Sequence, residues 1–485
     1  MLKDLHSANS EGFIDLVYID PPFNSKRDYN ILFESIDMKD TKAQKEAFSD
    51  TWSNVSYIDT INEIQSLDLD LYSFLSNLDS IKVPKGTVSY LSTMAIRIYY
   101  IHKVLKDTGS FYLHCDPTMS HPLKMICDLI FGAKNFRNEI IWSYNKWAVS
   151  KISFSRNHDI ILFYSKDMDN ISFNTLFQDR AASTLKRFGK KKIVSGFNDT
   201  GERLPSQTLE EESPGVIMSD VWNLPIIAPS SNERLGYPTQ KPEKLLERII
   251  QASSNKGDLV ADFFCGCGTT IAAAQRLKRN WIGVDISHLA VKLILDRLTQ
   301  PYPARRAKII RENIQVSGFP SDIDGAKMLA RETDNGRFRF QDWIIEVMLG
   351  GVANPKKTAD GGFDGYLPFY LTQDKKGNIL IEVKSGTIGL KNIREFIHVI
   401  EKRKAELGVF VCFEEQVSGE TRREAKQAGY FESESYPGKY DKIQILTVDD
   451  LLDGKGIALP YRKEAFKTAT KNLDYITDDP ELPFE

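Results

Sequence analysis

Runs of apolar residues, separated by turn-forming residues, divide the chain into segments with strand-like or helix-like spacing. Residues 13–20 (FIDLVYID) form a short apolar run that ends in an acid and precedes two prolines, which predicts a buried parallel strand. Residues 109–115 predict another strand, while 88–106 and 122–131 have helical spacing. Strands that alternate with helices in this way are typical of an α/β fold.

A second unit of this kind lies about 240 residues further along the chain. Residues 242–252 predict a helix with Pro242 in its first turn and an apolar stripe of leucine and isoleucine. The segment 258–277 (DLVADFFCGCGTTIAAAQRL) then reads as a strand, a glycine loop and a helix, and 281–287 (WIGVDIS) reads as the next strand. This order predicts a βαβ unit with a crossover helix.

Between these two units the regular spacing is lost. Residues 134–204 are basic and aromatic, with thirteen Lys and Arg against seven Asp and Glu, and 205–236 are rich in Pro, Ser and Glu and read as loop. We interpret 134–236 as an insert in a domain that covers residues 1–300.

The last third of the chain predicts a smaller α/β domain. The polar, charged stretch 301–335 reads as a linker, and a domain follows at 336–485. The elements expected in this domain are a helix at 342–350, strands at 363–371 and 378–384, a helix at 391–407, a strand at 408–413 and a terminal α/β piece.

Composition narrows the class of protein. The 485 residues are 41% hydrophobic and 27% charged, with a net charge of −3, so any nucleic-acid binding must come from a local basic patch. The five cysteines include no CxxC pair, which argues against a zinc cage or a disulfide framework. No apolar run resembles a signal peptide or a membrane span. We therefore expect a cytoplasmic protein.

The glycine loop is a candidate cofactor site. Glycines let the backbone approach a ligand, and Asp285, 23 residues after Asp262, stands where dinucleotide folds hold ribose hydroxyls. The loop is not GxGxxG and lacks the GK[ST] of a phosphate-binding loop. An acid at its entrance suits a cationic amino group better than a pyrophosphate. S-adenosylmethionine has that amino group and a ribose, but a tight turn without a ligand is the open alternative.

The tetrapeptide Asp20, Pro21, Pro22 and Phe23 is a candidate catalytic turn. Two prolines stiffen the turn and remove two N–H donors, so the Asp20 carboxylate and the Pro21 carbonyl can both point at one amino group. Phe23 can stack on a base. Two acceptors can draw a conjugated amino nitrogen toward tetrahedral geometry and stabilise charge in the transition state. The alternative is a strand-ending loop without catalytic function.

Through these motifs, residues 13–300 resemble the amino-methyltransferase family of bacterial DNA methyltransferases. DPPF is similar to its catalytic motif, DFFCGCGTT to its cofactor motif, GVDIS to its ribose-binding strand, and TQKPEKLLERII (239–250) to the helix that precedes the cofactor motif. LHCDP (113–117) also resembles a strand end of this group. The order of the motifs, with the catalytic one first, resembles the permuted beta class.

The resemblance implies a Rossmann-like methyltransferase sheet with an inserted recognition region, and it implies S-adenosylmethionine as the cofactor. Family members with Asp first in the tetrapeptide mostly methylate adenine, so N6 of adenine is the expected target, with N4 of cytosine as the alternative. Members usually have a further strand upstream, so we expect a truncated or mis-started N-terminus. The cofactor residues implied are Asp262, Phe264, Gly266, Gly268, Thr269 and Asp285, with Lys241 and Pro242 nearby.

The insert is expected to read double-stranded DNA, and the target base is expected to be flipped out of the helix into the pocket. Its lysines and arginines would contact phosphates and its aromatics would stack on bases. The alternatives are core packing for the aromatics and a solvated face for the cations. The residues concerned are Phe136, Trp142, Tyr144, Trp147, Phe154 and Phe188, together with Lys186, Arg187, Lys190, Lys191 and Lys192.

The last domain resembles the PD-(D/E)xK nuclease fold, and specifically Mrr-like restriction endonuclease domains. Asp364 precedes one strand, and Glu382 and Lys384 lie 18 and 20 residues later on one face of the next. The stretch 349–366 adds to the likeness. Asp364 and Glu382, with Glu346, would hold Mg²⁺, and Lys384 would position a water. The alternative is a hairpin that carries D, E and K by chance.

Three rival functions remain open from the sequence. They are a methyltransferase whose last domain binds DNA without cleaving it, a methyltransferase of RNA or protein glutamine, and a dinucleotide-dependent oxidoreductase. The sequence also leaves a homodimer open as the assembly. All methyltransferase versions share one geometric requirement. The proline turn after residue 19 and the glycine turn at 266–268 must meet at neighbouring strand ends.

Overall fold

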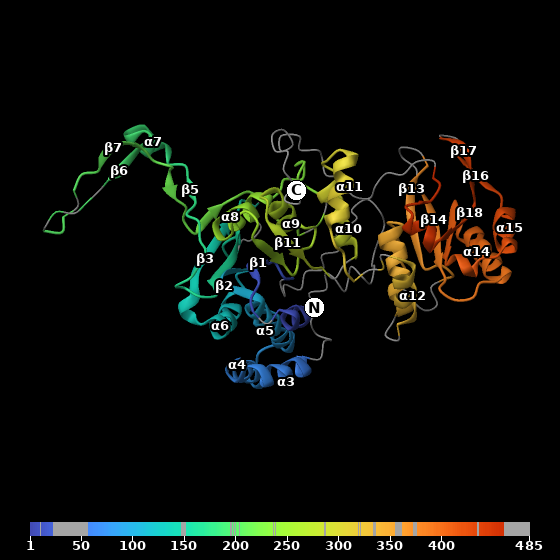
Figure 1. The fold of residues 1–485 in the computed structure, drawn as a ribbon, viewed down its shortest axis with the longest axis horizontal. Helices are drawn as coiled ribbons and strands as arrows, with labels where there is room; N and C mark the ends of the chain where they lie inside the picture. The colour runs from blue at the N-terminus through green and yellow to red at the C-terminus, as the bar shows by residue number, and fades with distance from the viewer. Residues whose placement is uncertain are drawn as a thin grey trace.

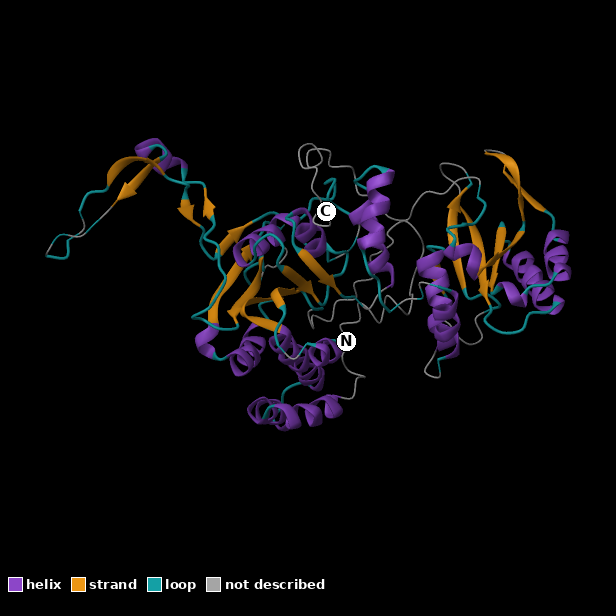
Figure 2. Ribbon diagram, viewed as in Figure 1, coloured by secondary structure: helices purple, strands orange, loops and turns teal. Residues whose placement is uncertain are grey.

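Two α/β sheets organise the chain and confirm the predicted fold class (Figures 1 and 2). The computed structural model describes residues 1–9, 11–22, 57–146, 152–194, 196, 198, 200–202, 204–235, 237, 239–285, 288–318, 320, 322–332, 336–354, 361–371, 376–433 and 436–459. Within that part, no helix combines the length and the apolar character that a membrane span requires.

The first sheet has seven strands and joins the two halves of the motif set. Four parallel strands come first, and β4 runs antiparallel to β2. In spatial order the strands are β11 (Asn280–Gly283), β10 (Leu259–Asp262), β1 (Ile14–Ile19), β2 (Leu105–Cys115), β4 (His158–Ser165), β3 (Phe136–Ser143) and β9 (Val221–Asn223).

The apolar run of β1 follows from burial on both faces of this sheet. Val17 and Ile19 face a core shared with α3 (Tyr57–Leu67), α4 (Leu69–Ser80), α5 (Lys85–Val104) and α6 (Ser120–Phe131). Leu16 and Tyr18 face the opposite core, shared with α8 (Glu243–Ser253) and α9 (Thr269–Arg276). The short α1 (Leu2–Ala8) packs on α5, and η2 (Ala133–Asn135) follows α6.

The stretch 134–236 contributes both to the sheet and to a projecting arm. β3, β4 and β9 complete the sheet, while the arm extends away from it at the end opposite the second sheet (Figure 1). The arm consists of β5 (Phe177–Gln178), α7 (Ala182–Phe188), β6 (Lys191–Val194), β7 (Gln207–Glu212) and β8 (Val216–Ile217). Residues 205–236, expected as loop, thus contain three short strands. β7 gave no strand signal because every residue of QTLEEE is exposed.

Three helices follow the first sheet: α10 (His288–Thr299), α11 (Ala304–Asn313) and α12 (Ile323–Arg331). The last two lie inside the stretch 301–335 that the sequence predicts as linker. Ala326 and Leu329 of α12 are buried in the core of the second sheet. The polar composition reflects helices that expose most of their surface rather than the absence of helices.

The second sheet carries the elements expected after residue 336. Its order is β12 (Val352–Ala353), β13 (Gly365–Tyr370), β14 (Lys376–Val383), β15 (Leu407–Cys412) and β18 (Ile443–Thr447). One face packs on α12, α13 (Gly336–Asp342), the π-helical η3 (Trp343–Met348) and α16 (Val448–Leu452). The other face packs on α14 (Leu390–Arg403) and α15 (Gly419–Gln427). The remaining elements are η4 (Glu414–Gln416), β16 (Tyr430–Ser433) and β17 (Tyr436–Asp441).

Candidate functional site

The two turns that the sequence predicts as one site follow neighbouring strands. β1 and β10 are parallel, with Leu16 opposite Val260 and Val17 opposite Ala261. Asp20 comes directly after β1 and Asp262 is the last residue of β10, so both acids lie at the same edge of the sheet. The required meeting of the proline and glycine turns is therefore confirmed. Ligands of open α/β sheets bind at this carboxyl edge.

The glycine turn has a backbone that only glycine adopts easily. Gly266 has φ +50° and its N–H donates to Asp285 Oδ2 at 2.8 Å. Gly268 has φ +73°, and a Cβ built there would lie 2.5 Å from Cγ1 of Ile294 in α10. A Cβ at Gly266 would come within 3.2 Å of the Tyr237 ring. The loop thus forms a cradle that side chains would fill.

Asp262 holds this loop from inside. It is 2% exposed, its Oδ1 accepts from Phe264 N at 3.0 Å, and its Oδ2 accepts from Thr270 Oγ1 at 2.5 Å. Burial, reinforced by the charges of Asp20 and Asp285, raises the pKa of Asp262 from 3.8 to about 7, against the effect of these two hydrogen bonds. Asp262 is therefore first a residue that shapes the loop, and its contact with a cationic amino group stays a prediction.

The carboxylates also test which ligand the cradle fits. The charges of Asp20 and Asp285 both act on the buried carboxyl of Asp262. Lys241 offsets the charge of Asp20, and the other acids at this strand edge oppose a pyrophosphate and favour a ligand with positive charge. The residues present therefore fit S-adenosylmethionine, with its ribose, better than they fit a dinucleotide.

Asp20 forms an ion pair with Lys241, a residue that the sequence places near the cofactor. Both side chains are largely buried, at 14% and 12% exposed. Pro242 is the N-cap of α8, so the start of this helix carries the lysine to the proline turn. Pro21 is buried and Pro22 is half-buried, while Phe23 lies outside the described residues.

A buried polar chain beside Asp20 was missed by the sequence reasoning. Tyr18 Oη lies 2.8 Å from His114 Nδ1, His114 Nε2 lies 3.3 Å from Asp159 Oδ2, and Tyr144 Oη donates to Asp159 Oδ1 at 2.9 Å. Burial opposes ionisation of Asp159, but His114 together with Lys241 prevails and lowers the pKa of this carboxyl to about 2. His114 belongs to the LHCDP segment, which was the available signal.

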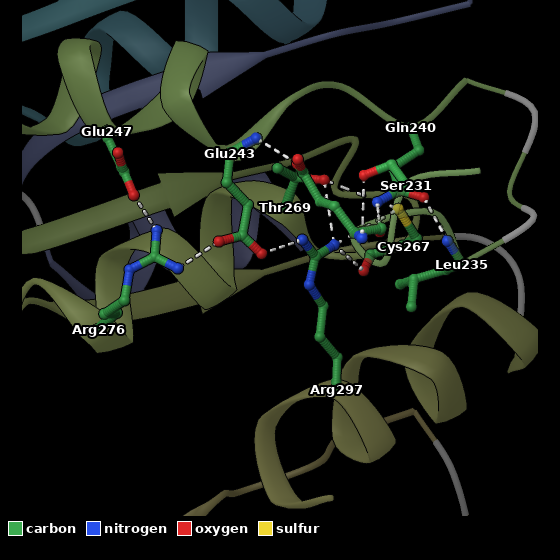
Figure 3. Close-up of polar contacts among 10 residues, drawn as sticks. Ser231, Leu235, Gln240, Glu243, Glu247, Cys267, Thr269, Arg276 and Arg297 are labelled. Carbon is green, nitrogen blue, oxygen red and sulfur yellow. Dashed lines mark hydrogen bonds and ion pairs between the residues drawn. The ribbon is translucent and has the colours of Figure 1, made fainter. Parts of the chain in front are cut away.

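A second network fixes the glycine turn from outside (Figure 3). Arg297 of α10, 8% exposed, donates from Nη1 to the Cys267 carbonyl at 3.3 Å and to Thr269 Oγ1 at 3.2 Å. Its Nη2 pairs with Glu243 Oε1 at 2.6 Å, and Glu243 also pairs with Arg276. Arg297 lies 30 residues after Cys267, and nothing in its local sequence indicates this role.

The same network reaches the segment before α8. Glu243 N donates to Glu233 Oε1 at 2.7 Å, and Leu235 N donates to Gln240 Oε1 at 2.8 Å. Gln240 Nε2 in turn donates to the Glu233 carbonyl at 2.7 Å. The segment that ends in Lys241 is thereby tied to the cofactor loop through shared partners.

The predicted DNA-reading residues separate into core and surface. Trp142 and Tyr144 are buried in the sheet core, so core packing accounts for them, whereas Phe154 is 99% exposed. Phe136 and Phe188 are half-buried, and Trp147 lies outside the described residues. The five cations of the arm are exposed, and two of them pair across strands: Lys191 with Glu210 at 3.3 Å and Lys192 with Glu211 at 2.9 Å.

The predicted magnesium site is not supported. Asp364 Oδ1 accepts from Gln341 Nε2 at 2.9 Å and its Oδ2 accepts from Val383 N at 2.8 Å. Glu382 is ion-paired with Lys384. Among the described residues, no group of three or more His, Cys, Asp or Glu could hold a metal, so Glu346 does not complete a site with the other two acids. These residues do not fit the metal.

Comparisons with known proteins agree with both parts of the fold. Residues 14–296 match the sequence model of the family N6_N4_Mtase, described as DNA methylase. Residues 339–453 match the family described as NACHT-associated inactive Restriction Endonuclease 1. The second match bears on the predicted nuclease, because that family is described as inactive.

Three curated relatives resemble the first part. DNA adenine methyltransferase YhdJ of Escherichia coli (strain K12) is 28% identical over 299 residues, which cover 61% of this chain and 80% of the relative. Type II methyltransferase M.HpaI of Haemophilus parainfluenzae is 26% identical over 292 residues, which cover 60% of this chain and 70% of the relative. Type II methyltransferase M1.MboII of Moraxella bovis is 33% identical and covers 39% and 72%. Because the family match spans more than half of the chain, the protein belongs to the N6/N4 DNA methylase family of S-adenosylmethionine-dependent DNA methyltransferases.

Proposed function

We propose that the chain methylates N6 of adenine in double-stranded DNA as a beta-class enzyme. The observation that carries the proposal is the placement of Asp20 and the glycine cradle after two adjacent parallel strands. A methyl donor and an amino acceptor bound at these two turns would share one pocket. Asp262, Phe264, Gly266, Gly268, Thr269 and Asp285 are the residues proposed to seat the cofactor.

The chemistry divides between the two turns. S-adenosylmethionine, when bound, supplies the electrophilic methyl group. Asp20 accepts a hydrogen bond from the amino group of the base, and the carbonyl of Pro21 is the second acceptor. Preorganised acceptors stabilise the positive charge that develops on the nitrogen during transfer. Lys241, which pairs with Asp20, keeps that carboxylate in place until the base arrives.

Adenine is favoured over cytosine by two observations. The first position of the tetrapeptide is Asp, which in the resembling family goes mostly with adenine. The relative YhdJ is named a DNA adenine methyltransferase and aligns over 299 residues. Two other relatives are named type II methyltransferases, which supports a restriction–modification setting for this chain.

Duplex DNA is proposed to lie between the sheet edge and the arm, with the target base flipped into the pocket. Lys186, Arg187 and Lys190 are exposed cations on the arm. Lys191 and Lys192 form ion pairs with Glu210 and Glu211, whereas these three form no ion pair among the described residues. Phosphate contacts from such side chains give salt-dependent affinity. The arm is thus the proposed recognition element.

The test is a modified-base read-out. The full chain is expressed in a host without its own DNA methylation, and plasmid DNA is sequenced with detection of modified bases. We expect N6-methyladenine at one defined motif and none with Asp20→Ala. Methylated cytosine at N4 would reject the adenine assignment, and unmodified DNA from a folded chain that binds S-adenosylmethionine would reject the proposal as a whole.

We also propose that the C-terminal domain does not cleave DNA. Asp364, Glu382 and Lys384 are engaged with partners inside the protein, and the matching family is described as inactive. Supercoiled plasmid incubated with the protein and Mg²⁺ should stay supercoiled for the wild type and for Asp364→Ala alike. Nicking by the wild type alone would restore the nuclease assignment and the Mrr-like reading with it.

A further inference from the structure

The carboxylate of Asp364 is held by two donors from different elements. Gln341, the penultimate residue of α13, is 2% exposed and donates from Nε2 to Asp364 Oδ1 at 2.9 Å. Val383, the last residue of β14, donates from its backbone N–H to Asp364 Oδ2 at 2.8 Å. Asp364 itself is 8% exposed. Its two oxygens therefore both serve contacts inside the protein.

The geometry identifies which end of the Gln341 amide faces Asp364. The same Nε2 lies 3.5 Å from the Val383 carbonyl, so both neighbours are acceptors. Only the NH₂ end of a glutamine donates, so the nitrogen must point at them. Donor hydrogens thus point at the carboxylate from the side of α13, and a cation approaching from that side would meet them instead of oxygen ligands.

The second acid of the predicted triplet is also engaged. Gly365 pairs with Ile381 in the antiparallel register of β13 and β14, which places Asp364 opposite Glu382 at the end of the pair. Glu382, 12% exposed, is ion-paired with the ammonium group of Lys384. The lysine that would position a water in a nuclease here neutralises the carboxylate beside it.

We propose that the C-terminal domain is a nuclease fold closed by an internal lock formed by Gln341, Asp364 and Val383, and that Gln341 is the residue that excludes a divalent cation. Mg²⁺ and Mn²⁺ require oxygen ligands, and carboxylates are the usual protein source. The NH₂ group of Gln341 donates a hydrogen bond to the Asp364 carboxylate. It carries no negative charge, so it cannot act as a ligand for a cation at that position. The lock instead ties α13 to the ends of β13 and β14.

The lock predicts how Asp364 affects stability. In an open metal site without metal, facing carboxylates repel, so Asp→Asn relieves strain or changes little. In the lock, both carboxyl oxygens of Asp364 accept hydrogen bonds, and Asn would present an NH₂ to one of the two donors. A buried donor left without an acceptor is costly. The two arrangements therefore predict opposite signs for Asp364→Asn.

The first experiment measures backbone hydrogen exchange of β13 and β14 in the full chain. Asp364→Asn is expected to speed exchange by about tenfold. Titration of the wild type with MgCl₂ or MnCl₂ in a calorimeter is expected to give no heat that depends on Asp364. Unchanged or slower exchange in the variant, or Asp364-dependent binding of either metal by the wild type, would overturn the proposal.

A second variant tests the role of Gln341 directly. Gln341→Glu replaces the donor with a carboxylate of the same shape, so exchange of β13 and β14 should rise in EDTA and return toward the wild-type rate with MnCl₂. Adding Asp364→Asn to this variant should abolish the response to metal. The matched control is Gln444→Glu, because Gln444 also donates to backbone carbonyls but lies on β18. A metal response absent from Gln341→Glu, or equally present in the control, contradicts the assignment to Gln341.

Discussion

Lys241 forms an ion pair with Asp20 although 221 residues separate them in sequence. The contact joins the segment before α8 to the turn after β1, at the edge where the glycine cradle also lies. The contact places Lys241 beside the acid that is proposed to receive the base, while its role toward the cofactor stays a prediction.

This relationship predicts the effect of removing the cation. Lys241→Met should lower kcat/KM for DNA methylation by about ten- to a hundredfold, because Asp20 loses the partner that orients it, while KM for S-adenosylmethionine changes little. Lys241→Arg should retain more activity than Met. The exposed Lys244 on the same helix is the matched control, and Lys244→Met should match the wild type in steady-state kinetics. A raised KM for the cofactor alone would instead return Lys241 to the cofactor half.

Gly268→Ala should weaken S-adenosylmethionine binding by about tenfold or more. The added Cβ faces Ile294 at 2.5 Å and the residue must keep φ +73°, so the turn has to shift. Gly257→Ala is the matched control, because Gly257 also has positive φ (+86°) but has open space around its Cβ position. Calorimetric titration of both variants separates the two causes. Equal loss in both would mean that backbone strain alone is responsible.

Asp262 predicts a pH dependence of stability. Its folded pKa of about 7 lies above the ordinary value of 3.8, so between these two pH values the folded chain binds more protons at this group than the unfolded chain. Its contribution to the free energy of unfolding therefore falls as pH rises from about 4 to 7, by about 4 kcal/mol at most. The melting temperature of the wild type minus that of Asp262→Asn should fall as pH rises from 5 to 7.5 and can change sign within that range. A difference that stays constant with pH would contradict the raised pKa.

Arg297 predicts a loss of cofactor affinity from outside the cradle. Arg297→Met removes the donors to the Cys267 carbonyl and Thr269 Oγ1, so binding of S-adenosylmethionine should weaken about tenfold and exchange of residues 263–270 should quicken. Arg276→Met is the control, because Arg276 pairs with Glu243 and Glu247 of α8. If both variants bind the cofactor equally, the network acts only through the stability of α8 and α9.

The arm predicts a salt-dependent contribution to DNA binding. Reversing Lys186, Arg187 and Lys190 to Glu should weaken duplex binding and reduce the slope of log K against log salt by about 3. Reversing Lys191 and Lys192 should have a smaller effect, because Glu210 and Glu211 already neutralise them. Fluorescence anisotropy at several salt concentrations measures both slopes. Equal slopes for all variants would place the phosphate contacts elsewhere.

The sequence predicted those parts of the fold whose structure follows from a pattern within a single segment. The apolar run of β1, the glycine turn and the stripe of α8 each reflect local packing, and all three elements formed where expected. The strands of the arm and the helices α11 and α12 were missed, because their exposed polar surface removes the periodicity on which such predictions rest.

The candidate site shows the same division. The tight turn at residues 266–268 could be predicted, because glycines at 266 and 268 allow the positive φ that the turn requires. The pairing of Lys241 with Asp20 and the clamp by Arg297 depend on which strands become neighbours, and no local pattern encodes that. The magnesium prediction was not supported for a related reason. The spacing of Asp364 and Glu382 is right for a metal, but Gln341 arrives from another element.

The central position of β1 has a consequence for biosynthesis. β2 can pair with it early, but the partner on its other side, β10, is encoded about 240 residues later. At roughly 5–20 residues per second, translation leaves that edge of β1 unpaired for roughly 12–50 s. An apolar strand with an open edge is prone to wrong pairing. The nascent chain should therefore depend on chaperone protection until residue 262 has left the ribosome, and slower translation of the arm would lengthen that dependence.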